Sequence, residues 1–556
     1  MKKTGALLFA LILLLTITAN AYFSVYAYVS GDYEYTVSSG NATITAYNGS
    51  EANLSVPSVL NGYTVTAIDE QVFSGKTALE SITVPSTVTQ LGSRCFYNCI
   101  KLRSVNLPSG ITEIPDKCFA YCSALESITL AWNITKIHRE AFNGCSSLQS
   151  FPLQSTLTYI GDGAFMGCTA LEIDLITLPS SVTYIGSQAF RNCYNVSGNV
   201  SIGANVSVGS LAFDACGVSA INFDSNHAKY SSLNGVVFNK DKTVLIRYPA
   251  GNPATSYTIP STVTSLDSYA FHRAQYLETV NIPASVTDIG TYAFTACQRL
   301  DNVILPDTVT AIEAYTFNSC PMLHYITLPY TLTSIGTHAF GYSDLYEINL
   351  PSSLESIGKY AFYRNAHLAE VNIPNSVTQM ENFVFDGCKA LQNVTLPANL
   401  TALPWGTFNN CEALEEITVP EGYTEIEGSA FNGCTSLTTV NLPSTLTAIG
   451  RNAFNGTALA DVYYNGSYVD WNNVSVNASG NQPLINANMH FLVEHIHEYA
   501  IAGCQNGTVY FACSCGDSYI VQFSEYINAD EETLDINGDG IVNIRDYSLI
   551  AQQTGE

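Results

Sequence analysis

The fold is decided by a stretch that recurs along the chain and is most complete at residues 430–450, which read AFNGCTSLTTVNLPSTLTAIG. Within it, the segment Thr439-Val440-Asn441-Leu442 alternates polar and apolar residues, which is the period of a β-strand. We expect Val440 and Leu442 to point into the core, and Thr439 and Asn441 to point into solvent. Pro443 lacks a backbone donor, so the strand is expected to end there. Each copy therefore predicts a short strand followed by a turn.

Phenylalanine recurs with a spacing close to 23 residues over most of the chain, and sixteen of the 25 phenylalanines follow this spacing. These comb phenylalanines are Phe73, Phe96, Phe119, Phe142, Phe165, Phe190, Phe213, Phe271, Phe294, Phe317, Phe340, Phe362, Phe385, Phe408, Phe431 and Phe454. A fixed period of roughly 20 to 29 residues is typical of leucine-rich repeats, whose turns bury their apolar face only against neighbouring turns. We therefore expect one β-rich leucine-rich repeat solenoid of about sixteen turns with an extended parallel sheet, rather than several compact domains.

Eleven of the 16 cysteines follow a comb phenylalanine by three residues. They are Cys99, Cys122, Cys145, Cys168, Cys193, Cys216, Cys297, Cys320, Cys388, Cys411 and Cys434. Leucine-rich repeats place Asn or Cys at a buried turn position, and side chains on successive turns point in parallel, which does not suit a disulfide. The pattern predicts a ladder of buried thiols. Cys95 and Cys118 lie outside the ladder, one repeat apart, and are the solenoid pair to test for a bridge.

The motif Ala-Phe-x-x-Cys-x-x-Leu, followed by Ile-Thr-Leu-Pro and Leu-Thr-x-Ile-Gly, is nearly complete at Ala430 to Gly450. It resembles the BspA-like leucine-rich repeat family over roughly residues 33–490. We expect an N-terminal cap and first turn at 28–66 and a solenoid at 67–490, with a hairpin insertion near 224–256 and a terminal cap at 462–490. The resemblance implies a bacterial or protist cell-surface protein that adheres to proteins, host cells or other microbes, and it supplies no catalytic residues.

Composition and the first residues indicate the compartment and exclude some partners. The chain has 47 acidic against 21 basic side chains, a formal charge of −26, which argues against nucleic acids and anionic membranes as partners. Lys2 and Lys3 precede an apolar run from Ala6 to Ile17, which reads as a signal peptide within residues 1–27. The alternative is a retained membrane anchor. We expect a secreted protein, extracellular or attached to the cell surface, without a membrane span in its mature chain.

The outward strand positions are mostly hydroxyl and amide side chains, and we expect them to bind a protein or a polysaccharide. The alternative is that they are solvated residues that simply favour strands. The histidines are scattered over the turns without a matched nucleophile, so we expect no enzyme. The outward positions are Ser81, Thr83, Ser104, Asn106, Ser127, Thr129, Thr279, Asn281, Asn302, Tyr325, Thr327, Asn349, Asn372, Asn393, Thr395, Thr439 and Asn441.

A different pattern follows the solenoid at residues 491–522, where cysteine and histidine replace the repeat. His497, Cys504, Cys513 and Cys515 have the ligand types of a zinc site, although the spacing lacks the usual two-residue gap. A disulfide with a free thiol, or no bond at all, remains the alternative. The segment resembles a short Cys/His module of secreted clostridial surface proteins.

The last module, residues 530–556, contains a loop with the ligand spacing of an EF-hand, followed by a segment that we expect to be helical. Calcium needs several oxygen ligands around a tightly wound loop, and Gly540 sits where the sharp turn is required. The predicted ligands are the side chains of Asp535, Asn537, Asp539 and Asp546, the carbonyl of Ile541, and Asn543 either directly or through a water. A polar linker is the alternative interpretation.

This loop and its helix resemble a type I dockerin repeat, the module that attaches secreted proteins to cohesins of scaffolding proteins in cellulosome-like assemblies. The resemblance implies that cohesin would be contacted by Ile544, Arg545, Ala551 and Gln552. Dockerins normally carry two repeats and this chain shows one, so a second repeat or a dimer would complete the module. We expect a non-catalytic recognition or adhesion protein with calcium-dependent attachment. The alternatives are an adhesin whose calcium loop is only structural and, less favoured, a polysaccharide-active enzyme.

Overall fold

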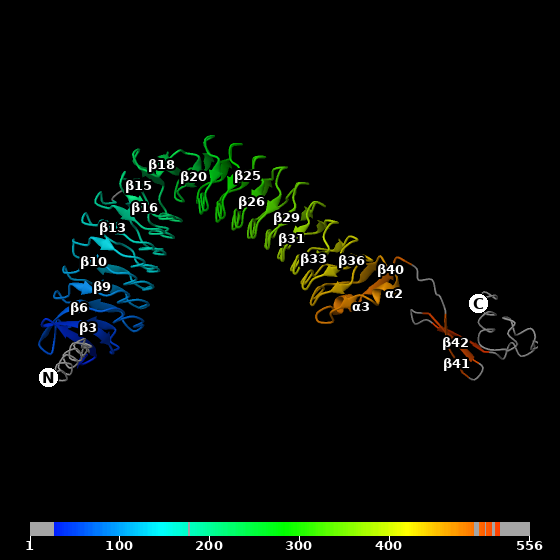
Figure 1. The fold of residues 1–556 in the computed structure, drawn as a ribbon, viewed down its shortest axis with the longest axis horizontal. Helices are drawn as coiled ribbons and strands as arrows, with labels where there is room; N and C mark the ends of the chain where they lie inside the picture. Colours follow the sequence, from blue (N-terminus) through cyan, green and yellow to red (C-terminus); the bar gives the residue numbers. More distant parts are fainter. Residues whose placement is uncertain (1–26, 176–177, 494–499, 506–507, 514–517, 523–556) are drawn as a thin grey trace, which may run out of the picture. The chain divides into compact units, whose positions relative to one another are not determined.

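The computed structural model describes residues 27–175, 178–493, 500–505, 508–513 and 518–522 (Figure 1). This part of the chain forms a β-solenoid of about 20 leucine-rich turns, with little helix. The chain divides into unit 1, residues 1–329, and unit 2, residues 330–556, which are described separately. The solenoid predicted from the comb phenylalanines is confirmed. It has more turns than the about sixteen expected, because some turns place other residues at the comb position.

Each regular turn contributes two strands, and the two kinds of strand form two separate parallel rows. In the turn quoted above, β36 (Thr439–Leu442) belongs to row A and β37 (Ala448–Ile449) belongs to row B. Row A is the strand that the alternation predicted. Row B was not predicted, because its strands mostly span two residues, which is too short for an alternating pattern to show.

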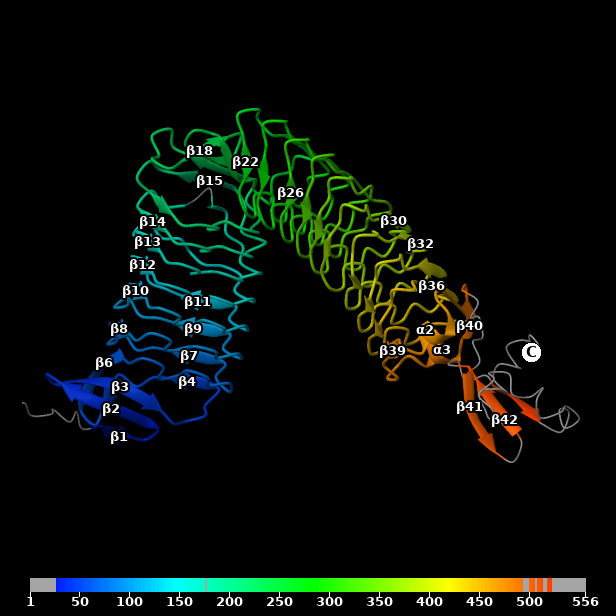
Figure 2. The ribbon, with the colours of Figure 1, turned by 45° about the vertical axis from the view of Figure 1, so that its right-hand side comes forward.

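Row A pairs in register from turn to turn, so equivalent residues stand side by side, as in β7, β9 and β11 (Figure 2). In unit 1 it consists of β4 (Asn53–Ser55), β7 (Ser81–Thr83), β9 (Ser104–Asn106), β11 (Ser127–Thr129), β15 (Asn199–Ile202), β17 (Ala220–Phe223), β21 (Ser256–Thr258), β23 (Thr279–Asn281), β25 (Asn302–Ile304) and β27 (Tyr325–Thr327). In unit 2 it consists of β30 (Glu370–Asn372), β32 (Asn393–Thr395), β34 (Glu416–Thr418), β36, β38 (Asp461–Tyr464) and β40 (Asn488–Phe491).

Row B runs along the same turns. In unit 1 it comprises β8 (Gln90–Leu91), β10 (Glu113–Ile114), β12 (Lys136–Ile137), β13 (Tyr159–Ile160), β14 (Tyr184–Ile185), β16 (Ser207–Val208), β20 (Val244–Arg247), β22 (Ser265–Leu266), β24 (Asp288–Ile289) and β26 (Ala311–Ile312). In unit 2 it comprises β28 (Ser334–Ile335), β29 (Ser356–Ile357), β31 (Gln379–Met380), β33 (Ala402–Leu403), β35 (Glu425–Ile426), β37 and β39 (Ser475–Val476).

The irregular elements lie at the ends and at one insertion. The first sheet has the order β1 (Tyr28–Ser30), β2 (Tyr33–Ser38), β3 (Asn41–Tyr47), β6 (Tyr63–Ile68) and β5 (Val59–Leu60). In the insertion, β18 (Tyr230–Leu233) and β19 (Val236–Asn239) form an antiparallel hairpin that continues into β20. Unit 2 also contains α2 (Tyr468–Trp471), α3 (Gln482–Asn486) and an antiparallel sheet of β41 (Ala500–Gln505), β42 (Thr508–Ala512) and β43 (Ser518–Gln522).

The comb phenylalanines form the centre of the core, where the rings of successive turns stack on one another. The Phe73 and Phe96 rings lie 5.3 Å apart at an angle of 3°. Such contacts add to the gain from burying the rings. Tyr248 holds the comb position 23 residues before Phe271, and their rings lie 5.2 Å apart. The phenylalanine spacing does not mark this turn, because a tyrosine takes the comb position.

The repeated Ile-Gly pair at the end of row B has a steric cause. A Cβ atom on Gly161 would lie 2.6 Å from the carbonyl carbon of His138 in the preceding turn. A Cβ atom on Gly450 would lie 2.5 Å from the backbone nitrogen of Gly428. Successive turns can approach this closely only where the side chain is missing, so glycine here sets the packing distance between turns.

The cysteine ladder is buried, as the spacing predicted. Most of its thiols donate to the carbonyl of the comb phenylalanine one turn earlier, as Cys122 Sγ does to Phe96 O at 3.0 Å. Where Asn365 replaces cysteine, its amide donates to Phe340 O at 2.8 Å. Cys95 and Cys118 are both buried free thiols, so the bridge considered for this pair is not formed in the structure.

Candidate interaction face

Row A presents the same kind of surface in most of its strands, because the central residue is buried and its two neighbours face solvent. In β9, Val105 is buried whereas Ser104 and Asn106 are exposed. Since the strands pair in register, the outward residues form two columns across successive turns. The outward placement predicted from the alternation is confirmed for the row A strands. Asn349 is also exposed, but no row A strand forms in its turn.

In unit 1 the outward columns of row A are uncharged. All ten row A strands of this unit lack Asp, Glu, Lys and Arg. Two apolar side chains interrupt the hydroxyls and amides: Ile304 is 62% exposed and Tyr325 is 48% exposed, on neighbouring strands β25 and β27. Isoleucine and tyrosine side chains with this much solvent contact provide apolar surface that a binding partner could bury.

In unit 2 the same columns carry carboxylates. Glu370, Glu416 and Asp461 occupy the first outward position of β30, β34 and β38. The strand between each pair carries a neutral residue there, Asn393 in β32 and Thr439 in β36. The outward residues of row A are thus uncharged in unit 1 and include carboxylates in unit 2, whereas the strands of both units alternate buried and outward residues in the same way.

A shallow groove of about 460 Å³ lies on row A of unit 2, between β32 and β34. Its walls are the outward residues Asn393 and Thr395 on one strand and Glu416 and Thr418 on the next, with Glu415 at one end. The groove exists because row A opens at this point: in the described part of unit 2, no strand pairing joins β32 to β34. Carboxylates beside unpaired strand edges offer acceptors to a positively charged or hydrogen-bond-donating group.

Another surface feature is a series of aromatic rings two residues before the comb phenylalanines. In unit 1, the rings of Tyr269 and Tyr292 lie 4.8 Å apart, and those of Tyr292 and Tyr315 lie 4.6 Å apart, nearly parallel. In unit 2, His338, Tyr360 and Phe383 are stacked in the same way. Ring faces that contact each other are covered, so these stacks stabilise the turns rather than offer flat platforms to a ligand.

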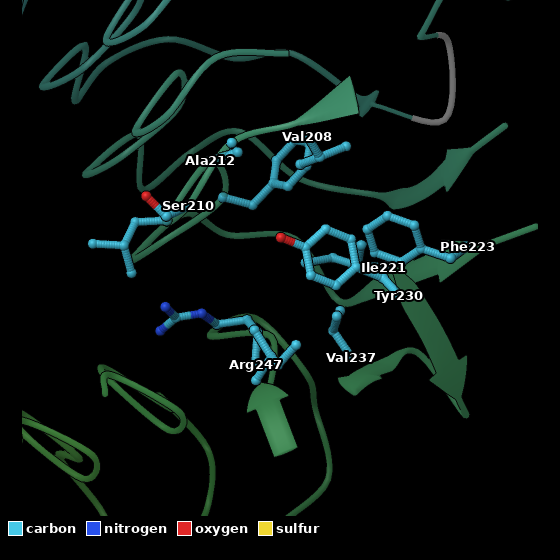
Figure 3. Close-up of a pocket in the computed structure, with 12 residues that line it drawn as sticks. Val208, Ser210, Ala212, Ile221, Phe223, Tyr230, Val237 and Arg247 are labelled. Atoms are coloured by element: carbon cyan, nitrogen blue, oxygen red, sulfur yellow. The ribbon is translucent and has the colours of Figure 1, made fainter. Parts of the chain in front are cut away.

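The insertion of unit 1 contains a small pocket and a buried charge cluster. The pocket, of about 60 Å³, is lined largely by apolar side chains, including Phe223 and Tyr230, with Arg247 at its edge (Figure 3). This volume holds a few waters at most. Beside it, the fully buried carboxylate of Asp214 lies 3.0 Å from Arg247 Nη1, 3.1 Å from Arg191 Nε and 2.9 Å from His272 Nδ1.

The ionisation of Asp214 follows from these neighbours. Burial raises the pKa of its carboxyl, but the hydrogen bond from His272 and the charges of Arg247 and Arg191 outweigh burial, and the pKa lies below its ordinary value. Hydrogen bonds from Arg247 and His272 and the charge of Arg191 therefore hold the insertion against the turns on either side. This arrangement is structural.

Five histidines pair with a carboxylate from an earlier turn, at distances from 2.6 to 2.9 Å. They are His138 with Glu113, His272 with Asp214, His324 with Asp301, His367 with Asp344, and His490 with Asp461. An imidazole held by a carboxylate resembles part of a catalytic triad, which also needs a hydroxyl or thiol nucleophile hydrogen-bonded to the ring.

Burial makes ladder thiols such as Cys216 and Cys434 poor nucleophiles, because it raises the pKa of each to about 12. A thiol with such a pKa stays protonated at neutral pH, and only the thiolate reacts. Cys99 differs, because a hydrogen bond with Cys122 lowers its pKa. The thiols whose pKa is raised therefore contribute packing.

The predicted metal ligands fall largely outside the described residues. This holds for His497 and Cys515 and for every predicted calcium and cohesin-contacting residue between 535 and 552. The structure places Cys504 in β41 opposite Val509 of β42, and it buries Cys513 just beyond β42. Among the described residues, no group of three or more His, Cys, Asp and Glu side chains could hold a metal ion.

The predicted signal peptide also lies outside the described residues, apart from residue 27. Within the described ranges, no helix has the length and apolar character needed to cross a membrane.

Known proteins similar to this chain are leucine-rich repeat proteins. One solved structure is a leucine-rich cell surface protein from Faecalibacterium prausnitzii A2-165, at 28% identity over 83% of this chain and 100% of that chain, with a TM-score of 0.43. Another is a leucine-rich repeat protein from Bacteroides ovatus ATCC 8483, at 21% identity over 84% and 100% of the two chains, with a TM-score of 0.35. The pneumococcal vaccine antigen PcpA matches at 20% identity over 85% and 99%, with a TM-score of 0.37.

None of the curated proteins matches the chain. The family comparison is decisive for the repeats. The model described as BspA type leucine-rich repeat region matches six copies, over residues 47–172, 169–242, 250–369 and 355–481. These matches cover most of the chain and coincide with the turns of the solenoid. The chain therefore belongs to the BspA-type leucine-rich repeat family.

Proposed function

We propose that this protein is a secreted or surface-attached recognition protein without catalytic activity, which binds a protein or polysaccharide through the outward face of row A. The observation that carries the proposal is the pair of solvent-facing columns, which repeat in register over consecutive turns. Repeat proteins of this construction bind through such extended surfaces. The family includes surface proteins, which supports a binding or adhesion role.

The proposal predicts that bulky charged groups on row A block binding and that the same groups on row B do not. Asn106→Arg and Asn281→Arg change exposed row A residues, whereas Gln90→Arg and Gln379→Arg change exposed row B residues. Binding of the four variants would be measured on intact epithelial cells, on bacterial cells and on immobilised soluble polysaccharides. We expect the row A variants to lose at least about tenfold in binding affinity and the row B variants to keep nearly the native affinity. Equal losses in both sets would overturn the proposal.

We further propose that residues 530–556 bind calcium and attach the protein to a cohesin-bearing scaffold. Support comes from the sequence alone, in the spacing of Asp535, Asn537, Asp539 and Asp546 around Gly540. Titration of the full chain with calcium should show one tight site that Asp535→Ala with Asp539→Ala abolishes. Capture by immobilised cohesin should occur with calcium and disappear with a chelator. Calcium binding without capture would leave the loop with a structural role only.

The zinc site at His497, Cys504, Cys513 and Cys515 is also a proposal, supported by the ligand types. Metal analysis of the purified full chain tests it. About one zinc per chain, lost in Cys504→Ser, is the expected result. Zinc-free protein that yields a disulfide between two of these cysteines on mass analysis would contradict it.

A further inference from the structure

We infer that the outward face of row A in unit 2 docks a basic, extended segment of a partner protein, with a lysine or arginine side chain entering the groove between β32 and β34. The inference rests on the proposed function and names the chemistry of its partner. Three observations carry it: the spacing of the carboxylates, the distribution of charge in the two units, and the opening of row A at the groove.

Carboxylates recur on this face at the first outward position of every second strand of row A, at Glu370, Glu416 and Asp461. Strand register joins Glu416 to Asp461 through Thr439. Neighbouring paired strands lie about 4.8 Å apart, so these two carboxylates are about 10 Å apart. Asp461 is paired with His490 at 2.9 Å, whereas Glu416 accepts only the neutral amide of Asn441 at 2.9 Å. The column therefore offers negative charge that the face itself does not neutralise.

Among the described row A strands, charged residues occur in unit 2 and not in unit 1. Residues 330–490 contain fourteen Asp and Glu against four Lys and Arg. None of the four basic residues, Lys359, Arg364, Lys389 and Arg451, lies in a row A strand. In unit 1 the corresponding strands carry no charged residue. A surface with one sign of charge attracts an oppositely charged partner and gives it a preferred orientation.

The groove gives this face a defined contact point. Elsewhere in row A of unit 2, β30 pairs with β32, and β34 pairs with β36, in register. Between β32 and β34 the regular pairing is missing among the described strands, and Val394 is only half-buried, whereas Val371 and Ile417 are 1% and 2% exposed. Backbone groups and the Glu416 carboxylate thus line one opening. An ammonium or guanidinium group satisfies such acceptors with charge-assisted hydrogen bonds.

A protein segment fits this face better than a neutral polysaccharide does. The outward residues of β30, β32, β34 and β36 are Glu, Asn and Thr, with no aromatic ring among them. The first aromatic residue further along this face is Tyr463, whose ring stacks on that of His490 at 4.5 Å. A flat apolar sugar face would find no open aromatic partner here, whereas cationic side chains find carboxylates.

The test uses the full chain and a fluorescent 20-residue poly-L-lysine as probe, with poly-L-glutamate as the negative control. Glu370→Gln with Glu416→Gln removes two row A charges without changing side-chain size. Glu355→Gln with Glu425→Gln removes two exposed charges at row B and is the matched control. We expect the row A pair to raise Kd for poly-L-lysine about tenfold and the control pair to change it less than about twofold.

Other results would overturn the inference. Equal weakening by the two double variants would mean that only net charge matters. Tighter binding of a chitosan oligomer than of poly-L-lysine, with the same sensitivity to Glu416→Gln, would assign the face to a cationic polysaccharide. Binding of calcium alone that Glu415→Gln with Glu416→Gln abolishes would assign the groove to a metal. The proposed function fails separately, since it requires that Asn106→Arg in unit 1 also weakens adhesion to cells or polysaccharides.

Discussion

The carboxylate of Asp214 and the imidazole of His272 lie 2.9 Å apart, although 58 residues separate them in the chain. The same carboxylate also binds Arg247, 33 residues away, at 3.0 Å. These contacts join the turn before the insertion to the turns after it, at the place where the stacked comb phenylalanines give way to the hairpin β18–β19. An ion cluster around the fully buried carboxylate of Asp214 thus links the turns across the insertion.

Removal of this carboxylate should destabilise unit 1 strongly. Asp214→Asn leaves the guanidinium of Arg247 buried without its counter-charge, a loss of about 3 to 5 kcal/mol of unfolding free energy. Asp241→Asn, on the exposed turn between β19 and β20, is the matched control and should change little. Urea unfolding of both variants measures the difference. A variant at Asp214 that is as stable as the control would show that the cluster contributes no net stability.

The same variant has a pH signature. The pKa of Asp214 in the folded protein is held below its ordinary value. The stability that its carboxylate contributes is therefore fully present above the pKa of the group in the unfolded chain, and it is lost as the pH falls through the pKa of the group in the folded protein. The gap in stability between the native protein and Asp214→Asn should therefore be widest near neutral pH and narrow below about pH 4. A gap that widens on acidification would contradict this assignment.

Asp386 should behave in the opposite sense. Burial raises the pKa of its carboxyl, although hydrogen bonds from Asn409 and Asn410 and the charge of Arg364 act against burial. Ionisation of Asp386 at neutral pH therefore costs stability, and this cost disappears as the pH falls and the group is protonated. Asp386→Asn is expected to be as stable as the native protein or about 1 kcal/mol more stable at pH 7, with no gain at low pH. Thermal unfolding at the two pH values checks this, and a less stable variant at pH 7 would contradict it.

Asp386 also ends a directed ladder of amides in unit 2. Asn455 donates to Asn432 at 2.7 Å, Asn432 donates to Asn409 at 2.6 Å, and Asn409 donates to Asp386 at 2.8 Å. Asn432→Ala breaks two of these bonds in the middle of the ladder and should cost about 1 to 3 kcal/mol. Asn455→Ala removes only the terminal donor and should cost less. Equal losses in chemical unfolding would show that the bonds do not act as a chain.

The glycine at the end of row B should tolerate no side chain. Gly450→Ala would place Cβ 2.5 Å from backbone of the preceding turn, and we expect about 1 to 3 kcal/mol of destabilisation from overpacking. In Gly203→Ala the nearest atom is a side-chain carbon of Val206 at 3.6 Å, so this control should unfold like the native protein. A neutral Gly450→Ala would mean that successive turns can shift apart without loss.

Much of this architecture could be predicted from the sequence, because a periodic solenoid repeats one local arrangement. The spacing of Phe431 and Cys434 placed the ring stack and the thiol ladder, and the alternation around Val440 placed row A. Row B escaped prediction because a two-residue strand has no period. The turn at Tyr248 escaped because only phenylalanine was counted, although an aromatic residue 23 positions before Phe271 was a usable signal.

The face proposed for binding shows the same division. The sequence predicted outward hydroxyl and amide side chains, and it contained Glu416 and Asp461, but the arrangement of these two carboxylates in one column depends on strand register. The groove between β32 and β34 lies where the two strands do not pair, and no residue type in that stretch of sequence predicts the missing pairing. Strand register and its interruptions depend on how neighbouring turns pack against each other, and the sequence of a single turn does not contain this information.

The sequence by itself determined that the chain is a solenoid, since a fixed 23-residue period buries equivalent residues on every turn and leaves equivalent residues in solvent. Only the tertiary structure decided which distant groups meet. Asp214 contacts Arg247 and His272 across an insertion that has no repeat, and Glu416 and Asp461 share a column because their turns stack in register. Local periodicity fixes the shape of a turn, whereas contacts between turns depend on how the turns are stacked and interrupted.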